Sequence, residues 1–309
     1  MKKAVAVLAL IALGLILALA STFLPATLPA APATDLVAPE AHPPEGMKLW
    51  AIEAGTMQSQ AGFAYRGGKL GEPRTFGMGG ILVEHPQGRL LFDAGFGRNV
   101  DQHFRTIPWL MQAVSQYRKE TPVADQLKAA GIDFMDLKGV VLTHAHWDHV
   151  SGLQDMPGVP VWVPQAELDF INSGQRMTSL IRSFGAVNYH VYDFPDGAYL
   201  GFAQSYDVFD DGSVVLVPAP GHTPGSIIAF ITLPDDQRYA LLGDLVWQRE
   251  GIELPAEKPW MSRNMVDNDA EGVREAIVHL HQIHLAFPDM VMVPAHDRRV
   301  WDSLPQFHR

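Results

Sequence analysis

Residues 143–149 read Thr-His-Ala-His-Trp-Asp-His, a run in which metal-binding side chains crowd together directly after an apolar triplet. The triplet predicts the end of a buried strand, and the polar run predicts a loop that leaves it. His144 and His146 are two residues apart and can aim at one point. The next turn can bring Asp148 and His149 to a second point nearby. Imidazole and carboxylate suit zinc and other first-row metals, so the run predicts a metal site.

Three later loops offer further ligands, each after an apolar stretch. Residues 220–226 read Pro-Gly-His-Thr-Pro-Gly-Ser and hold His222 in a turn fixed by glycine and proline. Asp244 ends the stretch Leu-Leu-Gly-Asp, and His296 ends Val-Met-Val-Pro-Ala-His. Each loop alone is weak evidence for a metal site, because a single His or Asp at a strand end is usually a polar residue without a ligand role. Together with the first run, they predict one shared site.

The sequence resembles the metallo-β-lactamase superfamily of hydrolases, whose main motif is His-x-His-x-Asp-His. The resemblance rests on residues 144–149 and the three later loops, and it covers essentially residues 47–309. It implies an α/β fold, a four-layer αβ/βα sandwich with the metals at one edge between the sheets. It also implies the ligands: His144, His146 and His222 for a first metal, Asp148, His149 and His296 for a second, and Asp244 as the bridge.

The same resemblance implies a hydrolase that holds two Zn²⁺ ions per chain, or other first-row divalent metals. A hydroxide that bridges two metals is a nucleophile at neutral pH, and one metal polarises the substrate carbonyl or phosphoryl oxygen. Asp244 would set the metal–metal separation, and Asp148 could pass a proton to the leaving group. Asp93, in the turn Phe-Asp-Ala-Gly, matches another family motif and would orient the ligand loop.

The family contains several kinds of hydrolase, and the chain favours some over others. It has no cysteine, which excludes lactamases with a cysteine ligand. Only 13 residues follow His296, which disfavours glyoxalase II-like enzymes with an added helical domain. A small ester, lactone or related acyl substrate is favoured, as in acyl-homoserine lactonases. Trp247 stands where lactonases commonly have tyrosine, which weakens the case for a lactone. The alternatives are an all-histidine metallo-β-lactamase, a phosphoesterase, or an inactive anchored metal-binding protein.

Composition narrows the partners of this 309-residue chain, in which 47% of the residues are hydrophobic and the net charge is −11. The hydrophobic share is ample for a core. The negative charge disfavours binding to nucleic acid, which needs clustered Lys and Arg. We therefore expect a small-molecule substrate and no nucleic-acid partner.

The first residues predict export. Lys2 and Lys3 precede an uncharged apolar run at residues 4–20, which is typical of a signal peptide or an N-terminal membrane anchor. The sequence Ala-Leu-Ala before Ser21 has the form of a cleavage site. The domain would then be periplasmic or secreted, with or without an anchor at residues 4–20. Residues 21–46 are rich in proline and alanine and predict a linker without helix before the domain at 47–309.

Periodicity predicts a mixed sequence of strands and helices without repeats. Asn268 and Glu271 predict a capping box for the longest helix. The predicted strands are 48–54, 81–83, 89–92, 139–143, 159–163, 213–217, 227–233, 239–242 and 289–293, and the predicted helices are 107–117, 123–130, 164–171 and 268–287. Residues that could form an apolar substrate wall, or simply pack, are Tyr65, Phe104, Trp109, Met111, Trp260 and Met261. Ordinary surface or packing histidines are expected at His42, His85, His103, His190, His279, His281, His284 and His308, and Trp147 is expected to pack or to line the site.

Overall fold

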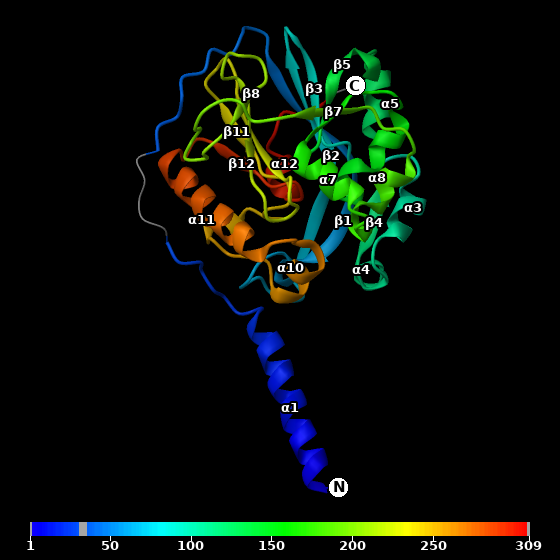
Figure 1. The fold of residues 1–309 in the computed structure, drawn as a ribbon, viewed down its shortest axis with the longest axis vertical. Coiled ribbons are helices and arrows are strands. Elements are labelled where there is room, and N and C mark those ends of the chain that lie inside the picture. Colours follow the sequence, from blue (N-terminus) through cyan, green and yellow to red (C-terminus); the bar gives the residue numbers. More distant parts are fainter. Residues whose placement is uncertain (1, 31–35, 308–309) are drawn as a thin grey trace.

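The computed structural model describes residues 2–30 and 36–307, which form two β-sheets packed face to face (Figure 1). The first sheet has the strand order β4-β1-β2-β3-β5-β6-β7, and the second has the order β12-β11-β10-β9-β8. The first consists of Gln116–Lys119 (β4), Lys48–Gln60 (β1), Pro73–His85 (β2), Gly88–Phe92 (β3), Leu137–Val141 (β5), Val161–Pro164 (β6) and Tyr189–Tyr192 (β7). The second consists of Val291–Val293 (β12), Arg238–Leu241 (β11), Ile227–Thr232 (β10), Val214–Pro218 (β9) and Tyr206–Asp207 (β8).

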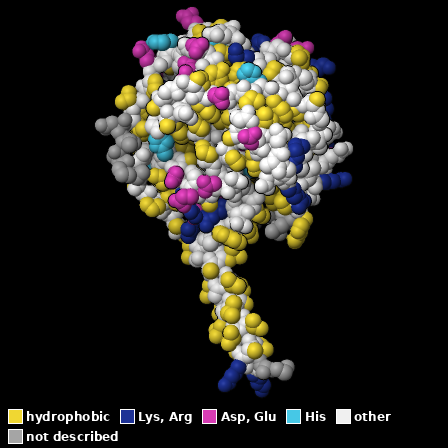
Figure 2. All heavy atoms as spheres, in the orientation of Figure 1, with side chains coloured by type: hydrophobic (Ala, Val, Ile, Leu, Met, Phe, Trp, Pro, Cys, Tyr) yellow, Lys and Arg dark blue, Asp and Glu magenta, His cyan; other side chains and the backbone are white. Residues whose placement is uncertain are grey.

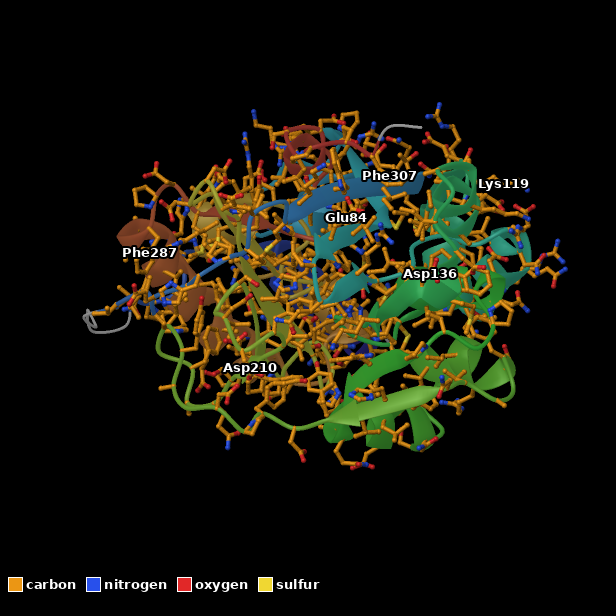
Figure 3. All side chains as sticks on the ribbon, turned by 90° about the horizontal axis from the view of Figure 1, so that it is seen from above. Glu84, Lys119, Asp136, Asp210, Phe287 and Phe307 are labelled. Atoms are coloured by element: carbon orange, nitrogen blue, oxygen red, sulfur yellow. The ribbon has the colours of Figure 1, made fainter. Side chains whose placement is uncertain are left out.

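Helices cover the outer face of each sheet. The bounds of all α-helices in the described residues are Lys2–Ser21 (α1), Ala61–Ala64 (α2), Val100–His103 (α3), Trp109–Val114 (α4), Val123–Ala129 (α5), Trp147–Val150 (α6), Gln165–Asn172 (α7), Ser179–Ser183 (α8), Glu250–Glu253 (α9), Trp260–Val266 (α10), Ala270–Ala286 (α11) and Arg298–Trp301 (α12). Helix α1 projects from the domain as a stem covered with hydrophobic side chains (Figure 2). Seen from above, Phe287 at the end of α11 and Asp136 in a 3₁₀ turn lie on opposite flanks (Figure 3). The predicted four-layer αβ/βα sandwich is thus confirmed.

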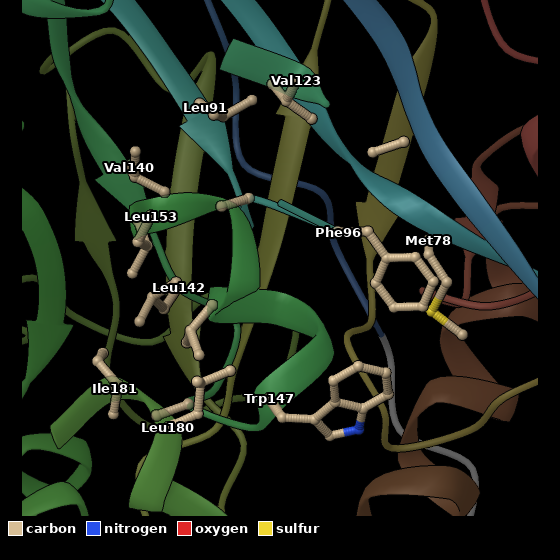
Figure 4. Packing of buried hydrophobic residues seen from close by; sticks show 14 of the residues in the cluster. Met78, Leu91, Phe96, Val123, Val140, Leu142, Trp147, Leu153, Leu180 and Ile181 are labelled. Carbon is tan, nitrogen blue, oxygen red and sulfur yellow. The ribbon is translucent and has the colours of Figure 1, made fainter. Parts of the chain in front are cut away.

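Alternation along the strands explains how both faces of a sheet are buried. In β3, Leu90 and Phe92 belong to the cluster between the sheets, whereas Leu91 belongs to the cluster under the helices. Strands that are buried on both faces read as continuous apolar runs, as β3 does. Figure 4 shows the helix-side cluster, where Leu91 and Val140 share one core with Leu180 of α8.

Helix α11 covers the outer face of the second sheet with the predicted stripe of Val273, Ile277, Leu280 and Ile283, all buried. The predicted capping box is wrong by one residue. The N-cap is Asp269, whose side chain accepts a hydrogen bond from the backbone N–H of Glu271 at 3.0 Å. Asn268 lies outside the helix, with its backbone N–H bonded to the His222 carbonyl oxygen at 3.0 Å.

The predicted helix at 107–117 is also wrong in its second half. Helix α4 ends at Val114, and Gln116–Lys119 forms the edge strand β4, which pairs antiparallel with β1. Most of β4 is polar and exposed, so its sequence lacks the alternation of apolar residues that predicts a strand. Strand β1 also extends well beyond residue 54, to Gln60, past a register shift between Glu53 and Gly55.

The linker predicted at 21–46 starts one residue too early, because Ser21 is the last residue of α1; the described residues 22–30 and 36–46 have no helix or strand. It nevertheless lies against the domain. The Leu28 N–H bonds to the Pro255 carbonyl oxygen at 2.8 Å, and the His42 N–H bonds to that of Asp211 at 2.7 Å. His308 lies outside the described residues.

The position of the α11 cap gives a test of stability. We expect Asp269→Ala to lower the free energy of unfolding by about 1 kcal/mol, because an N-terminal N–H of the helix loses its acceptor. Asn268→Ala is the matched control and should change stability by less than half as much. Urea unfolding followed by circular dichroism measures both. A larger loss at Asn268 than at Asp269 would contradict the observed cap.

Candidate metal centre

Four loops at one edge of the two sheets bring the predicted ligands together. The run 143–149 follows β5 of the first sheet, and the other three loops follow β9, β11 and β12 of the second. A backbone hydrogen bond of 3.0 Å from Ile227 N–H to the Thr143 carbonyl oxygen joins the sheets beside the site. Gly243, immediately before Asp244, has φ of 52°, a left-handed conformation that glycine adopts without strain.

All seven predicted ligands lie in one cluster, in overlapping groups whose ligand atoms are within 4.8 Å of one another. The groups are His144, His146 and His222; His144, His149 and Asp244; and Asp148, His149 and His296. Asp244 lies between the two predicted sites: its Oδ2 is 3.7 Å from His222 Nε2, and its Oδ1 is 3.0 Å from His296 Nε2.

The spacing of these atoms fits tetrahedral metal coordination. Ligand atoms about 2.0–2.1 Å from one zinc lie roughly 3.3 Å apart. His222 Nε2 is 3.2 Å from His144 Nε2 and 2.9 Å from His146 Nδ1. His296 Nε2 is 3.4 Å from Asp148 Oδ2.

Two atoms at the centre of the cluster lack the partners that buried polar atoms normally have. Among the described residues, His149 Nε2 and Asp244 Oδ1 are buried without a hydrogen-bond partner, although they lie 3.3 Å apart. An unpaired buried polar group costs free energy unless something else binds it. A cation between them would satisfy both, so the residues present fit a pair of metal ions.

Groups behind the imidazoles hold them in place. His149 Nδ1 is 2.7 Å from Asp93 Oδ2, and His296 Nδ1 is 2.9 Å from the carbonyl oxygen of Gly77. Such contacts at the second ring nitrogen fix the tautomer and leave the other nitrogen free for a metal. Asp93 also accepts hydrogen bonds from both the backbone N–H and the hydroxyl of Thr143, at 2.8 Å each. It lies behind the ligands, as the family pattern implies.

His222 is held by a buried ion pair that the sequence did not reveal. Its Nδ1 lies 2.7 Å from Asp267 Oδ1, and Lys258 Nζ lies 2.8 Å from the same oxygen. Lys258 and His222 hold the pKa of Asp267 below its usual value although burial acts to raise it. Asp267 and Lys258 flank α10, a helix that we did not predict, so no local pattern marked them.

Glu167 of α7 is a second positioning residue that the sequence analysis missed. It is fully buried and accepts hydrogen bonds from Ala145 N–H at 2.6 Å and Thr223 Oγ1 at 2.6 Å. A third bond comes from the Gly225 N–H at 3.1 Å. One carboxyl group therefore joins the loop of His144 and His146 to the loop of His222.

The electrostatic surroundings differ between the two halves of the cluster. Burial, together with the neighbouring imidazoles, lowers the pKa of His144 and His146 well below the usual value and keeps them neutral, as metal ligands must be. Burial also disfavours charge on His149, but the carboxylates of Asp93 and Asp244 raise its pKa well above the usual value. The half of the cluster that contains His149 therefore stabilises positive charge.

An apolar cavity opens directly above the cluster. Asp148, Asp244, His146 and His296 form its floor. Its walls carry six methionines: Met57, Met78, Met111, Met177, Met261 and Met265. Of the six residues predicted as a wall, Met111 and Met261 line it. Trp109 and Trp260 are exposed instead, Tyr65 packs in the core, and Phe104 packs on Trp147 at 5.8 Å.

The two tryptophans of the ligand loops have different roles. Trp147 is buried against Phe96 at 5.3 Å and also lines the cavity, so it both packs and faces the site (Figure 4). Trp247 donates a hydrogen bond from Nε1 to Asp244 Oδ2 at 2.8 Å. Its polar group is therefore used to position a predicted metal ligand.

A family model of the metallo-beta-lactamase superfamily matches residues 81–296. The chain belongs to this superfamily. A protein named "Probable metallo-hydrolase" from Mycobacterium tuberculosis is 30% identical over 240 residues, covering 70% of this chain and 73% of that protein. The N-acyl homoserine lactonase AttM of Agrobacterium fabrum is 26% identical over 241 residues, covering 74% of this chain and 86% of its own.

Solved structures of superfamily members share the fold. An N-acyl homoserine lactone hydrolase with the product N-hexanoyl-L-homoserine at its catalytic metal centre has a TM-score of 0.66 at 20% identity. The match covers 84% of this chain and 97% of that one. AidC, a dizinc quorum-quenching lactonase, has a TM-score of 0.55 at 16% identity, covering 85% and 91% of the two chains. The predicted membership in a superfamily of metal-dependent hydrolases is confirmed.

The remaining described histidines lie outside the cluster. His103 Nδ1 is 2.8 Å from Ser151 Oγ, His85 stacks on Phe209, and His190 stacks on Trp162. His279 and His281 each contact a backbone carbonyl oxygen at 2.8 and 2.7 Å. Among the residues that the structure describes, only the predicted ligands lie close enough together in groups of three to share a metal ion.

Asp93→Asn tests the support behind His149. We expect zinc affinity at the site containing His149 to fall about 10–100-fold, because the imidazole loses its charged partner. Asn tolerates the φ of 57° at this position, so the backbone should be preserved. Zinc binding is measured by competition with a chelating dye.

Asp155→Asn is the matched control for Asp93→Asn. Asp155 is also buried and accepts a backbone hydrogen bond, from Arg98 N–H at 2.8 Å, but it does not contact the cluster. Equal zinc affinity in the two variants would refute the role given to Asp93.

Proposed function

We propose that this protein is a dinuclear zinc hydrolase that cleaves an ester or lactone carrying an apolar acyl chain. The observation that supports this most directly is the pairing of the seven-residue cluster with the methionine-lined cavity above it. The cluster would hold the metals that hydrolysis needs, and the cavity would hold the acyl chain of the substrate. Methionine side chains are flexible and fill irregular gaps, which suits a substrate whose acyl chain can bend.

The proposed ligands follow the geometry. His144, His146 and His222 would hold one ion, Asp148, His149 and His296 would hold the other, and Asp244 would contact both. Two ions bound there would lower the pKa of a water toward 7 and polarise the acyl carbonyl. The protein orients the substrate by placing its chain among Met57, Met111 and Met265 and its carbonyl over the cluster floor. The apolar walls also exclude water from the reacting carbonyl.

Two aspartates have further proposed roles. Asp244 keeps the two halves of the cluster together, and the hydrogen bond from Trp247 fixes its Oδ2. Asp148 lies at the floor of the cavity, where its carboxylate would take the proton that the attacking water loses and deliver it to the leaving-group oxygen. Trp247 has no hydroxyl to offer the substrate, so the leaving group relies on Asp148.

The cavity disfavours anionic substrates. Its described lining includes no Lys or Arg side chain to pair with a phosphate or with the carboxylate of a β-lactam. A phosphoesterase and an all-histidine lactamase are therefore weaker assignments than an acyl hydrolase. The assignment as an inactive binding protein is weaker still, since all seven predicted ligands lie in groups that could hold a metal ion.

We also propose that the domain functions outside the cytoplasm, in the periplasm or at the outer surface of the inner membrane. Helix α1 begins with Lys2 and Lys3, and no residue of it is buried. It has the length and composition to cross a membrane, which signal sequences share. Basic residues remain on the cytoplasmic side, so the rest of the chain would be translocated.

A substrate panel tests the proposal. Zinc-loaded full-length protein should hydrolyse long- and short-chain acyl lactones and aryl esters, and should act poorly on a cephalosporin and a phosphomonoester, which are both anionic. The long-chain substrates should have the lower KM, because each buried CH₂ contributes about 0.8 kcal/mol. Zinc-loaded protein that is inert to all of these would refute the hydrolase assignment.

Met111→Gln should raise the KM for long-chain substrates about tenfold, because a polar amide replaces a thioether of similar size in the cavity wall. It should leave the kcat/KM for an acetyl ester nearly unchanged. Met135→Gln is the matched control, since Met135 is 54% exposed and does not line the cavity. Equal effects on long and short chains would contradict an acyl site at Met111.

Asp148→Asn separates metal binding from proton transfer. We expect kcat to fall about 10²–10⁴-fold, because the amide cannot carry the proton to the leaving group. Zinc content and rate are measured on the same sample. Substrates with highly acidic leaving groups, which need no protonation, should lose far less activity. A rate loss that only follows zinc content would assign Asp148 a ligand role alone.

A further inference from the structure

The connection between helix α1 and the domain is short and fixed. The guanidinium of Arg66 donates hydrogen bonds to the carbonyl oxygens of Ser21 at 3.2 Å and Leu24 at 3.3 Å. The N–H of Gly67 bonds to the carbonyl oxygen of Phe23 at 3.0 Å. Arg66 also pairs with Glu257 of the domain at 3.4 Å. The direction in which α1 leaves the domain is therefore set by specific contacts.

Helix α1 itself has the dimensions of a membrane span. Its 20 residues rise about 30 Å, the thickness of the hydrocarbon core of a bilayer. Its residues 4–20 carry no polar side chain, so every face of the helix is apolar, and none of its residues is buried. Its end is capped beyond the predicted cleavage site: Ser21 Oγ bonds to the Ala18 carbonyl oxygen at 2.6 Å and Thr22 Oγ1 to that of Leu19 at 2.8 Å. Cleavage after Ala20 would require this last turn to unwind.

The segment that follows α1 touches the wall of the cavity. The ring of Phe23 packs edge-on against Phe63, with centroids 6.0 Å apart, and Phe63 lines the cavity. Ser262 Oγ donates a hydrogen bond to the Phe63 carbonyl oxygen at 2.7 Å, which joins α2 to α10. Helix α10 places Met261 and Met265 in the same cavity wall. The segment after α1 and this wall of the cavity are thus neighbours.

Exposed apolar side chains surround this end of the domain. Trp109 of α4 is 74% exposed, Leu70 after α2 is 59% exposed, and Trp260 of α10 is 45% exposed. Each belongs to an element, or lies beside one, that lines the cavity through a neighbour such as Met111 or Met261. Figure 1 shows α4 and α10 at the end of the domain where α1 enters. Tryptophan is enriched where a protein meets the interface of a bilayer.

We propose that α1 remains attached as a membrane anchor and holds the mouth of the cavity against the bilayer. The exposed side chains of Leu70, Trp109 and Trp260, which we call the apolar rim, then lie in the lipid interface. An acyl substrate enters the cavity from the membrane. The part of this inference that concerns the substrate rests on the proposed acyl hydrolase function. A second copy of the domain would cover the rim but would leave α1 without an apolar environment, so the bilayer is the better occupant.

The absence of cysteine allows a direct test of placement on the full-length chain. Single cysteines are introduced as Leu70→Cys, as Asn264→Cys one turn from Trp260 on α10, and as Ala129→Cys, an exposed control at the end of α5. Each is labelled with an environment-sensitive fluorophore and reconstituted in phosphatidylcholine–phosphatidylglycerol vesicles. Lipid-borne nitroxide should quench the labels at positions 70 and 264 at least about threefold more than the label at 129. Equal quenching at all three positions would overturn the inference.

Two further measurements complete the test. The mass of the chain extracted from membranes should include residues 2–20, and a chain that begins at Ser21 would overturn the anchor. Trp109→Ser combined with Trp260→Ser should lower the rate on a long-chain substrate in vesicles at least about threefold. The same variant should hydrolyse a short water-soluble ester at the normal rate. Met135→Ser, which removes another exposed apolar side chain, is the control and should change neither rate. An equal loss on both substrates would contradict entry from the membrane.

Failure of this inference can be told apart from failure of the proposed function. Quenching and mass report placement whether or not the protein is active. An active enzyme with equal quenching refutes the membrane-facing mouth alone. A correctly placed protein that is inert to every acyl substrate refutes the hydrolase assignment alone.

Discussion

Five imidazoles and two carboxylates can share one buried centre only if groups behind them hold them there. The contact of 2.7 Å between His149 Nδ1 and Asp93 Oδ2 ties this centre to the end of β3 in the first sheet, because Asp93 directly follows β3. Asp267 holds His222 in the same way from the second half of the chain. Without these partners the imidazoles would turn to satisfy each other, and the free nitrogens would no longer converge.

This constraint explains why the site lies where the two sheets meet. The first sheet supplies the run 143–149, and the second supplies His222, Asp244 and His296. The cluster therefore exists only when the sheets are packed in one register, which the apolar core between them ensures. The hydrogen bond from Ile227 N–H to the Thr143 carbonyl oxygen and the carboxyl group of Glu167 add polar links between the halves.

The sequence was most informative where chemistry is local. Residues 144–149 carry four predicted ligands within six positions, and the predicted bounds of the short apolar strands before the ligand loops lie within two residues of the observed bounds. It was least informative where a residue acts across the chain. The polar β4 is a strand only because β1 lies beside it, and Glu167 reads as an ordinary helical acid until the fold brings Ala145 and Thr223 to it. The capping residue was misplaced by one position because Asn268 and Asp269 are both good caps.

Helix α10 links one wall of the cavity to the candidate metal centre, and this limits how that wall can adapt. Its first residue, Trp260, is exposed to solvent, and the residue after its end, Asp267, contacts His222. Lys258 before the helix pairs with the same Asp267, so both ends of α10 are tied to one buried ion pair. A hinge movement of α10 would pull on His222 and disturb the cluster. In the proposed hydrolase, the cavity wall would therefore adapt to different acyl chains by changes of side-chain rotamer, and methionine, with three rotatable bonds and a soft thioether, is well suited to that.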